Sequence, residues 1–150
     1  MGEKEEVSRF TEFKVLGLPK PQARPRAVSR GKFVKVYSPG TEWKEAVKYA
    51  ATKQEKITAE AIEVSLEFYF DRPKSHYGTG KNADKLKASA PRFHTKKPDV
   101  DNLAKAVLDA CQDAGLFKDD SMVLSLLIEK FYLDPGDDTK QGCKISIKEY

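Results

Sequence analysis

Strict alternation of apolar and polar side chains over residues 61–70 (AIEVSLEFYF) constrains the fold of this chain more than any other stretch. Ile62, Val64, Leu66 and Phe68 share one face, whereas glutamates and a serine occupy the other. Because successive side chains of a strand point to opposite faces, this pattern predicts a β-strand with one face in the core. The chain therefore builds at least part of its core from a sheet.

Two helices are marked by apolar stripes with spacings of three and four residues. The first begins at Ser38-Pro39, a capping residue followed by a proline suited to the first helical position. The second covers residues 101–114 and ends before Gly115. Further strands are expected at residues 10–18, 32–37, 122–133 and 143–150. This order predicts one compact α/β (α+β) domain over residues 1–150, with a mixed β-sheet packed by two main helices.

Composition excludes several classes of protein. The chain has no run of about 20 apolar residues, so no membrane segment is expected. Its charged N-terminus leads into no apolar signal core, so secretion is not expected. The two cysteines, Cys111 and Cys143, are far apart and form no CxxC pair. We therefore expect neither a zinc site nor a disulfide, and we place the protein in a reducing cytoplasm, with Cys111 a small core residue.

Charge is segregated along the chain, although the net charge is only +4. Residues 20–35 hold six basic side chains and no acid, and residues 72–97 hold eight basic side chains and one acid. Residues 99–120 invert the balance, with six aspartates and two lysines. Basic segments bind phosphates by releasing counterions, and carboxylates bind hard cations, so the pattern indicates an enzyme that acts on nucleic acid. The alternative is that the basic segments are solvated loops.

The two basic segments have different expected conformations. Three prolines between Pro19 and Arg26 exclude a helix or a sheet interior and predict an extended basic arm. The second segment contains prolines, glycines and scattered lysines. We expect it to form a mobile basic loop, about residues 72–97, that contacts DNA and becomes ordered on binding.

The residues that carry chemistry surround Asp99 and Asp101. On an extended segment, two carboxylates two positions apart face the same way. A third carboxylate from Asp119-Asp120 would complete a Mg²⁺ site with room for waters and a phosphate. Lys105 follows Asp101 by one helical turn, close enough to reach a phosphate oxygen.

Each of these residues also has a structural interpretation. Asp99 or Asp101 could cap the helix, Lys105 could pair with Asp101 or Asp109 along a solvated face, and Asp119-Asp120 could form a turn. His76 and His94 are interpreted as surface or DNA-facing side chains and not as general bases. From the residues alone, the chain has a possible metal site flanked by basic segments.

Two groups of residues resemble the RusA family of Holliday-junction resolvases. The resemblance spans residues 97–123 and is carried by Asp99-Val100-Asp101-Asn102-Leu103, Lys105, Leu108-Asp109-Ala110, Gly115 and Asp119-Asp120. A second similarity, to the N-terminal arm of phage and prophage members, is carried by Gly17-Leu18-Pro19, Gln22, Arg24-Pro25-Arg26 and Tyr37-Ser38-Pro39.

The resemblance implies a Mg²⁺-dependent endonuclease, with Mn²⁺ as a substitute, that works without a small-molecule cofactor. Asp99, Asp101 and Asp120 would be the catalytic metal ligands, Asp119 an auxiliary acid and Lys105 the essential basic residue. A homodimer would nick two strands of a four-way DNA junction symmetrically, in a bacterial or phage-infected cell. The expected DNA-binding residues are Lys20, Arg24, Arg26, Arg30, Lys32, Arg92, Lys96 and Lys97.

Three other functions remain open from the sequence. A less selective nuclease that cuts forks or flaps would use the same catalytic residues. A junction-binding protein that no longer cuts would keep the basic segments, and a Mg²⁺-dependent phosphatase would not need them. Steep salt dependence of binding separates DNA substrates from small esters.

Overall fold

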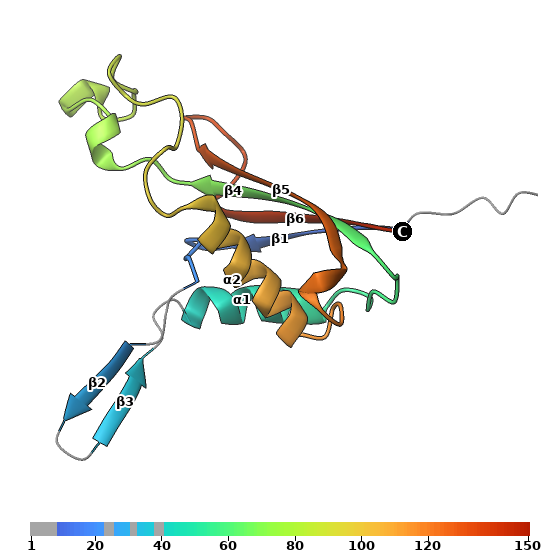
Figure 1. Ribbon diagram of the computed structural model, residues 1–150. Coiled ribbons are helices and arrows are strands. Elements are labelled where there is room, and N and C mark those ends of the chain that lie inside the picture. The colour runs from blue at the N-terminus through green and yellow to red at the C-terminus, as the bar shows by residue number, and fades with distance from the viewer. Residues whose placement is uncertain (1–8, 23–25, 31–32, 38–40) are drawn as a thin grey trace, which may run out of the picture.

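A four-stranded mixed sheet and two helices form the body of the computed structural model, which describes residues 9–22, 26–30, 33–37 and 41–150 (Figure 1). The strands lie in the spatial order β1 (Phe10–Leu16), β6 (Gly142–Glu149), β4 (Ile62–Phe70) and β5 (Val123–Tyr132). β4 pairs antiparallel with β6 and parallel with β5. The predicted single α+β domain with a mixed sheet is confirmed.

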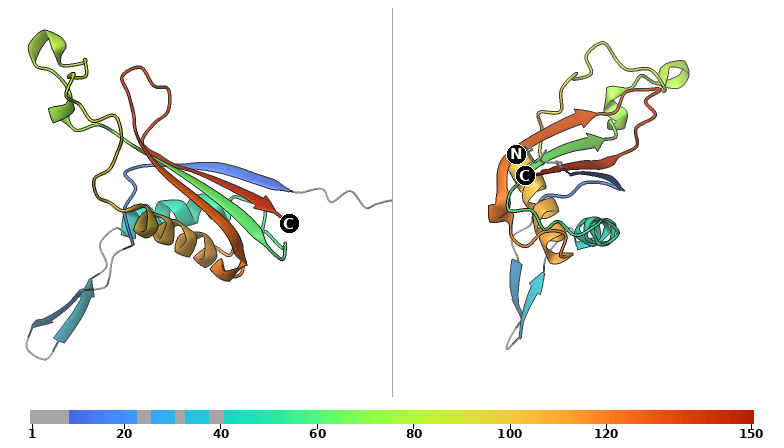
Figure 2. Two further views of the ribbon diagram at one scale, coloured as in Figure 1. Left: turned by 45° about the horizontal axis from the view of Figure 1, so that its top comes forward. Right: turned by 90° about the vertical axis from the view of Figure 1, so that its right-hand side faces the viewer.

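The core lies between the sheet and the helices α1 (Thr41–Thr52) and α2 (Val100–Asp113), which cover one face of the sheet (Figure 2). The predicted apolar face of β4 supplies its centre, since Ile62, Leu66 and Phe68 are each 0 % exposed. The helices contribute Trp43, Val47, Ala51, Leu103, Val107, Ala110 and Cys111. Binary patterning therefore correctly identified both the strand and the helical stripes that meet it.

α2 ends where the sequence predicts it to end. Gly115 has a φ of +75°, a backbone conformation that favours glycine. Its N–H donates to Gln112 O, and the N–H of Leu116 donates to Cys111 O, so the last turn of α2 is closed by backbone hydrogen bonds. This turn leads the chain back towards β5, which begins a few residues later.

A separate two-stranded hairpin contains β2 (Arg26–Arg30) and β3 (Phe33–Tyr37), paired antiparallel (Figure 1). The sequence predicts β3 but not β2, because β2 directly follows a run of prolines that favours an extended arm. Only residues 19–22 of that arm precede the hairpin within the described part of the chain, and they run beside α2, since Gln22 N–H donates to Asn102 O over 2.9 Å.

The polar segment 71–98 contains the short turns η1 (Lys74–His76) and η2 (Gly80–Asn82) and is attached to the end of β5. The Arg72 guanidinium bonds Asp134 at 2.9 Å and Pro91 O at 2.6 Å, and it lies 4.7 Å from the Tyr132 ring centroid. Cation–π contact and charge pairing therefore join the start of this segment to the end of β5, and the hydrogen bond to Pro91 O joins it to the later part of the same segment. Movement of the segment on DNA binding stays a prediction.

The interpretation of His76 as a surface side chain is wrong. His76 is only 6 % exposed and packs edge-on against Tyr132, with ring centroids 5.0 Å apart. The sequence around His76 is rich in lysine and therefore indicates an exposed position. The contact with Tyr132 could not be predicted, because that ring is 56 residues away in the chain.

The remaining composition-based expectations concern membranes and cysteines. Over the described residues, no helix has the length and apolar character required to cross a membrane. Cys111 and Cys143 are both free and buried, as small core residues are.

Candidate active site

Asp99 and Asp101 lie at the N-terminus of α2, and the prediction that both stand on an extended segment is wrong. Asp99 has extended backbone and is the N-cap residue, but the helix begins at Val100, so Asp101 belongs to its first turn. The good helix-forming residues that follow extend α2 backwards to this point. The Asp99 side chain makes no capping hydrogen bond, so its carboxylate is not used by the helix end.

Lys130 holds the segment that leads into Asp99. Its Nζ donates to Lys96 O over 2.6 Å and to Pro98 O over 2.8 Å. Burial lowers the pKa of this ammonium, and the negative charge of Asp99 opposes the shift. A half-buried cation from β5 therefore fixes the backbone beside Asp99 and places positive charge near its carboxylate.

Asp119 and Asp120 lie at the opposite end of α2. The Asp120 N–H donates to Gln112 Oε1 over 3.2 Å, and the Ser121 N–H donates to Asp119 Oδ1 over 3.1 Å. The hydrogen bond from Ser121 lowers the pKa of Asp119. The pKa of Asp120 is raised, chiefly by its hydrogen bond with Asp119 and also by desolvation and the charges of Asp119 and Asp109.

The length of α2 separates the two acidic groups within one subunit. Gln112 follows Asp101 by eleven positions, which corresponds to about 16 Å along the axis at about 1.5 Å per residue. In the described part of the chain, no three His, Cys, Asp or Glu side chains lie close enough to hold a metal ion. The predicted convergence of Asp99, Asp101 and Asp120 therefore does not occur within one subunit, and these residues alone do not fit a Mg²⁺ site.

Lys105 is exposed one turn beyond Asp101. Within the described residues, no carboxylate lies within 4.0 Å of its ammonium, whereas Asp109 pairs with Lys44 at 4.0 Å. The alternative in which Lys105 serves as an i,i+4 ion-pair partner is therefore not realised. Its charge remains available to a phosphate.

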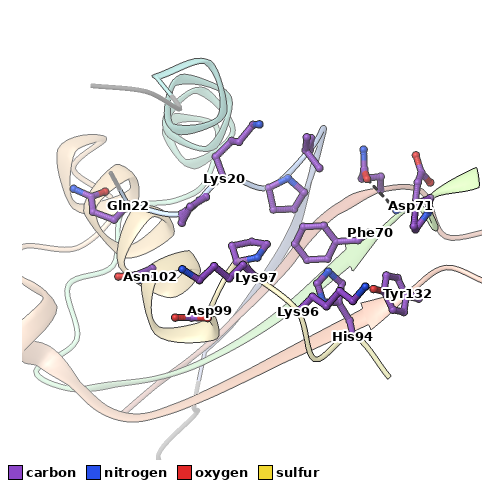
Figure 3. Close-up of a pocket in the computed structure, with 16 residues that line it drawn as sticks. Lys20, Gln22, Phe70, Asp71, His94, Lys96, Lys97, Asp99, Asn102 and Tyr132 are labelled. Atoms are coloured by element: carbon purple, nitrogen blue, oxygen red, sulfur yellow. Dashed lines mark hydrogen bonds between the residues drawn. The ribbon is translucent and has the colours of Figure 1, made fainter. Parts of the chain in front are cut away.

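The expected DNA-binding residues fall into three groups. Lys20, Lys96 and Lys97 line a cavity of about 590 Å³ together with Asp99 and Asn102 (Figure 3). Arg92 is exposed, with its guanidinium carbon 5.2 Å from the Phe93 ring centroid. Arg26 and Arg30 belong to β2. Arg24 and Lys32 lie outside the described residues.

Several residues around this cavity were not predicted from the sequence. Phe70 ends β4 and Tyr132 ends β5, and both rings contact His94, at centroid distances of 4.6 and 4.5 Å. Burial is the main cause that lowers the pKa of His94. The one available signal was that both parallel strands end in an aromatic residue.

Comparison with known proteins identifies the family of this chain. The chain matches the family model described as "Endodeoxyribonuclease RusA" over residues 17–142. It is also similar to "Uncharacterized protein YqaN" of Bacillus subtilis (strain 168), with 34 % identity over 125 residues that cover 81 % of this chain and 87 % of that protein. The family match includes both ends of α2, the N-terminal arm and the cavity-lining strands. The chain therefore belongs to the RusA endodeoxyribonuclease family, whose membership implies endodeoxyribonuclease activity.

Proposed function

We propose that the protein is a Mg²⁺-dependent endonuclease that resolves four-way DNA junctions by paired symmetric nicks, as a homodimer. The observation that carries this proposal is the carboxylate Asp99, which makes no capping hydrogen bond and lines the same cavity as Asn102 and three lysines. Carboxylates suit a hard divalent cation, and the lysines suit the phosphates of a DNA strand. The family relationship supports DNA as the substrate.

A homodimer is supported by the outer strand of the sheet. β5 is the edge strand next to β4, and three of its leucines are exposed, with Leu124 at 70 %, Leu126 at 39 % and Leu127 at 56 %. Because alternate residues face opposite sides, these leucines leave both faces of the edge apolar. Natural proteins rarely leave an apolar edge strand uncovered, and a second β5 in antiparallel register satisfies both its apolar side chains and its free backbone groups.

Such a dimer would also reunite the separated carboxylates. Asp120 lies in the turn immediately before β5, whereas Tyr132 at the far end of β5 lines the same cavity as Asp99. In an antiparallel pair centred on Leu126, the partner's Asp120 lies opposite Tyr132. Each active site would then combine Asp99 and Asp101 of one subunit with the partner's Asp120.

Mg²⁺, or Mn²⁺ as a substitute, would serve as Lewis acid in phosphodiester hydrolysis when held by this composite set. Lys105 would offset negative charge on the phosphate that reacts. Asp119 would serve as an auxiliary acid beside Asp120, because its hydrogen bond and its charge raise the pKa of Asp120.

The function is tested on a synthetic four-way junction with Mg²⁺, comparing wild type with Asp101→Asn and with a linear duplex of the same sequence. We expect symmetric nicks that require the junction, the metal and Asp101. Equal cutting of forks or flaps would favour the less selective nuclease. Junction binding without cutting under any divalent metal would refute nuclease activity and leave a binding protein.

The composite site is tested with heterodimers. A heterodimer of Asp99→Asn and Asp120→Asn has one intact site if the carboxylates come from different subunits, so about half of the wild-type nicking rate should return. If each site lies within one subunit, both sites are damaged and no activity returns. A heterodimer of Asp99→Asn and Asp101→Asn is the matched control, because it should be inactive in either arrangement.

A further inference from the structure

Phe93 is a large apolar side chain that the fold leaves in solvent. It is 68 % exposed, and its neighbour Arg92 places the guanidinium carbon 5.2 Å from the ring centroid. Among the described residues, no carboxylate lies within 4.0 Å of the Arg92 guanidinium. A single exposed phenylalanine is common on protein surfaces, but the backbone that carries this ring is held on both sides.

Contacts on both flanks of Phe93 hold the chain against the end of the sheet. Pro91 O accepts a hydrogen bond of 2.6 Å from Arg72, whose side chain is only 4 % exposed. On the other flank, the His94 ring stacks on Tyr132, with centroids 4.5 Å apart and an interplanar angle of 20°. Phe93 therefore lies between two anchored residues, and its own ring remains in solvent.

The same stretch of chain leads, still held, to the candidate active site. Lys130 Nζ donates to Lys96 O and to Pro98 O, and Asp99 is the next residue. Because Phe93 precedes Asp99 by six positions, their Cα atoms lie at most about 22 Å apart. A DNA strand rises about 3.4 Å per nucleotide. A strand with a phosphate beside Asp99 therefore has a nucleotide near Phe93, about six positions away or fewer.

The exposed side chains around Phe93 favour nucleic acid as the partner. Between Pro91 and Pro98 they include no acid and three cations, Arg92, Lys96 and Lys97. Cations bind phosphates by releasing counterions, and an aromatic ring can stack on any base, since every base has a flat π face. Because contacts already hold this stretch, binding would cost little further ordering of it. The family relationship supports DNA in particular.

We propose that Phe93 stacks on a base whose face is open at the point where the duplex arms of the DNA substrate meet, and that Arg92 binds a phosphate beside that base. Inside a linear duplex, the next base pair covers each base face, so a ring can enter only by separating stacked pairs. At a branch point, the pairs that end the arms can present an open face. Phe93 therefore favours branched over linear DNA. This inference rests on the proposed nuclease function.

The test is binding of a four-way junction and of a linear duplex of the same sequence, both without divalent metal so that no strand is cut. Phe93→Ala should weaken junction binding by about 5-fold or more, the loss expected for one base–aromatic stack. Its effect on duplex binding should be much smaller, so the preference for the junction should fall. Phe93→Trp should keep the preference, whereas Phe93→Leu, which is apolar but has no ring, should behave as Phe93→Ala does.

Arg92→Ala tests the phosphate contact. The logarithm of the affinity for DNA falls linearly with the logarithm of the salt concentration, with a slope set by the number of phosphates that the protein neutralises. Loss of one such contact should reduce the steepness of this slope by about one and weaken junction binding. An unchanged slope would overturn the contact given to Arg92.

Phe10→Ala is the matched control. Phe10 is 63 % exposed and begins β1, at the opposite end of the sheet from Tyr132, so its removal should leave both affinities unchanged. Thermal unfolding of every variant checks that its fold is retained. Equal losses of junction and duplex binding by Phe93→Ala, no loss of either, or wild-type binding by Phe93→Leu would overturn the inference.

Failure of the inference and failure of the proposed function have different results. If wild type cuts the junction with Mg²⁺ and Phe93→Ala keeps the wild-type preference in binding, the nuclease stands and the stacking contact is refuted. If wild type prefers the junction but does not cut it, and Phe93→Ala loses that preference, the nuclease is refuted and the stacking contact is supported. Equal affinity of wild type for junction and duplex overturns the inference whether or not the protein cuts.

Discussion

Replacing Leu124 by asparagine should weaken the proposed dimer without weakening the fold of the subunit. Leu124 is 70 % exposed in the isolated chain, so it contributes little to the subunit core. Complete burial of a leucine side chain contributes about 1.5–3 kcal/mol, so burial of the exposed part contributes about 1–2 kcal/mol per subunit and about 2–4 kcal/mol per two-fold dimer. That loss raises the dimer Kd by about 30- to 700-fold.

The dimer is measured by analytical ultracentrifugation over a wide range of concentrations, with the 16.9 kDa subunit as the reference mass. Tyr49→Asn is the matched control, because Tyr49 is 66 % exposed and belongs to α1, away from the β5 edge. Nicking activity of the Leu124 variant should fall at low protein concentration and return at high concentration, since each site of the proposed dimer would need both subunits. A dimer unaffected by Leu124→Asn, or a wild type that stays monomeric while it cuts, would refute the proposed interface.

Two further predictions concern the cavity and its supports. Lys130→Met removes both hydrogen bonds that hold the backbone before Asp99, and hydrogen bonds from charged groups that are partly solvated contribute about 1–3 kcal/mol in total. Denaturant unfolding should show that loss together with a lower kcat, and an unchanged kcat would contradict the role given to Lys130. His76 and His94 both have pKa values lowered by burial and by nearby cations, so the unfolded chain binds protons more readily than the folded one. Their contribution to stability is therefore complete above about pH 6.5, the unfolded pKa, and is lost as the pH falls below it. Thermal unfolding between pH 7.5 and 5.5 should show a larger decrease for wild type than for His76→Phe, and parallel decreases would contradict this assignment.

Local pattern was sufficient to predict the four strands of the main sheet and both helices. The alternation around Leu66 and the stripes on both helices depend only on the period of each element and on burial of apolar side chains, which act the same way in any context. β2 was not predicted because its pairing with β3 is a contact between strands, and propensity near Pro25 favoured an open arm. The burial of His76 was missed for the same reason, since it depends on a ring from β5.

For the candidate site too, local sequence and tertiary structure determined different things. The sequence by itself predicts which residues carry the chemistry, because Asp99, Asp101, Lys105 and Asp120 resemble the family motif in residue type and spacing. Only the tertiary structure decided where they lie. The length of α2 separates Asp101 from Asp120, and β5 then carries the chain back to the cavity that Asp99 lines. A carboxylate motif therefore predicts a reaction, whereas helix length and strand order determine which of its side chains can meet within one subunit.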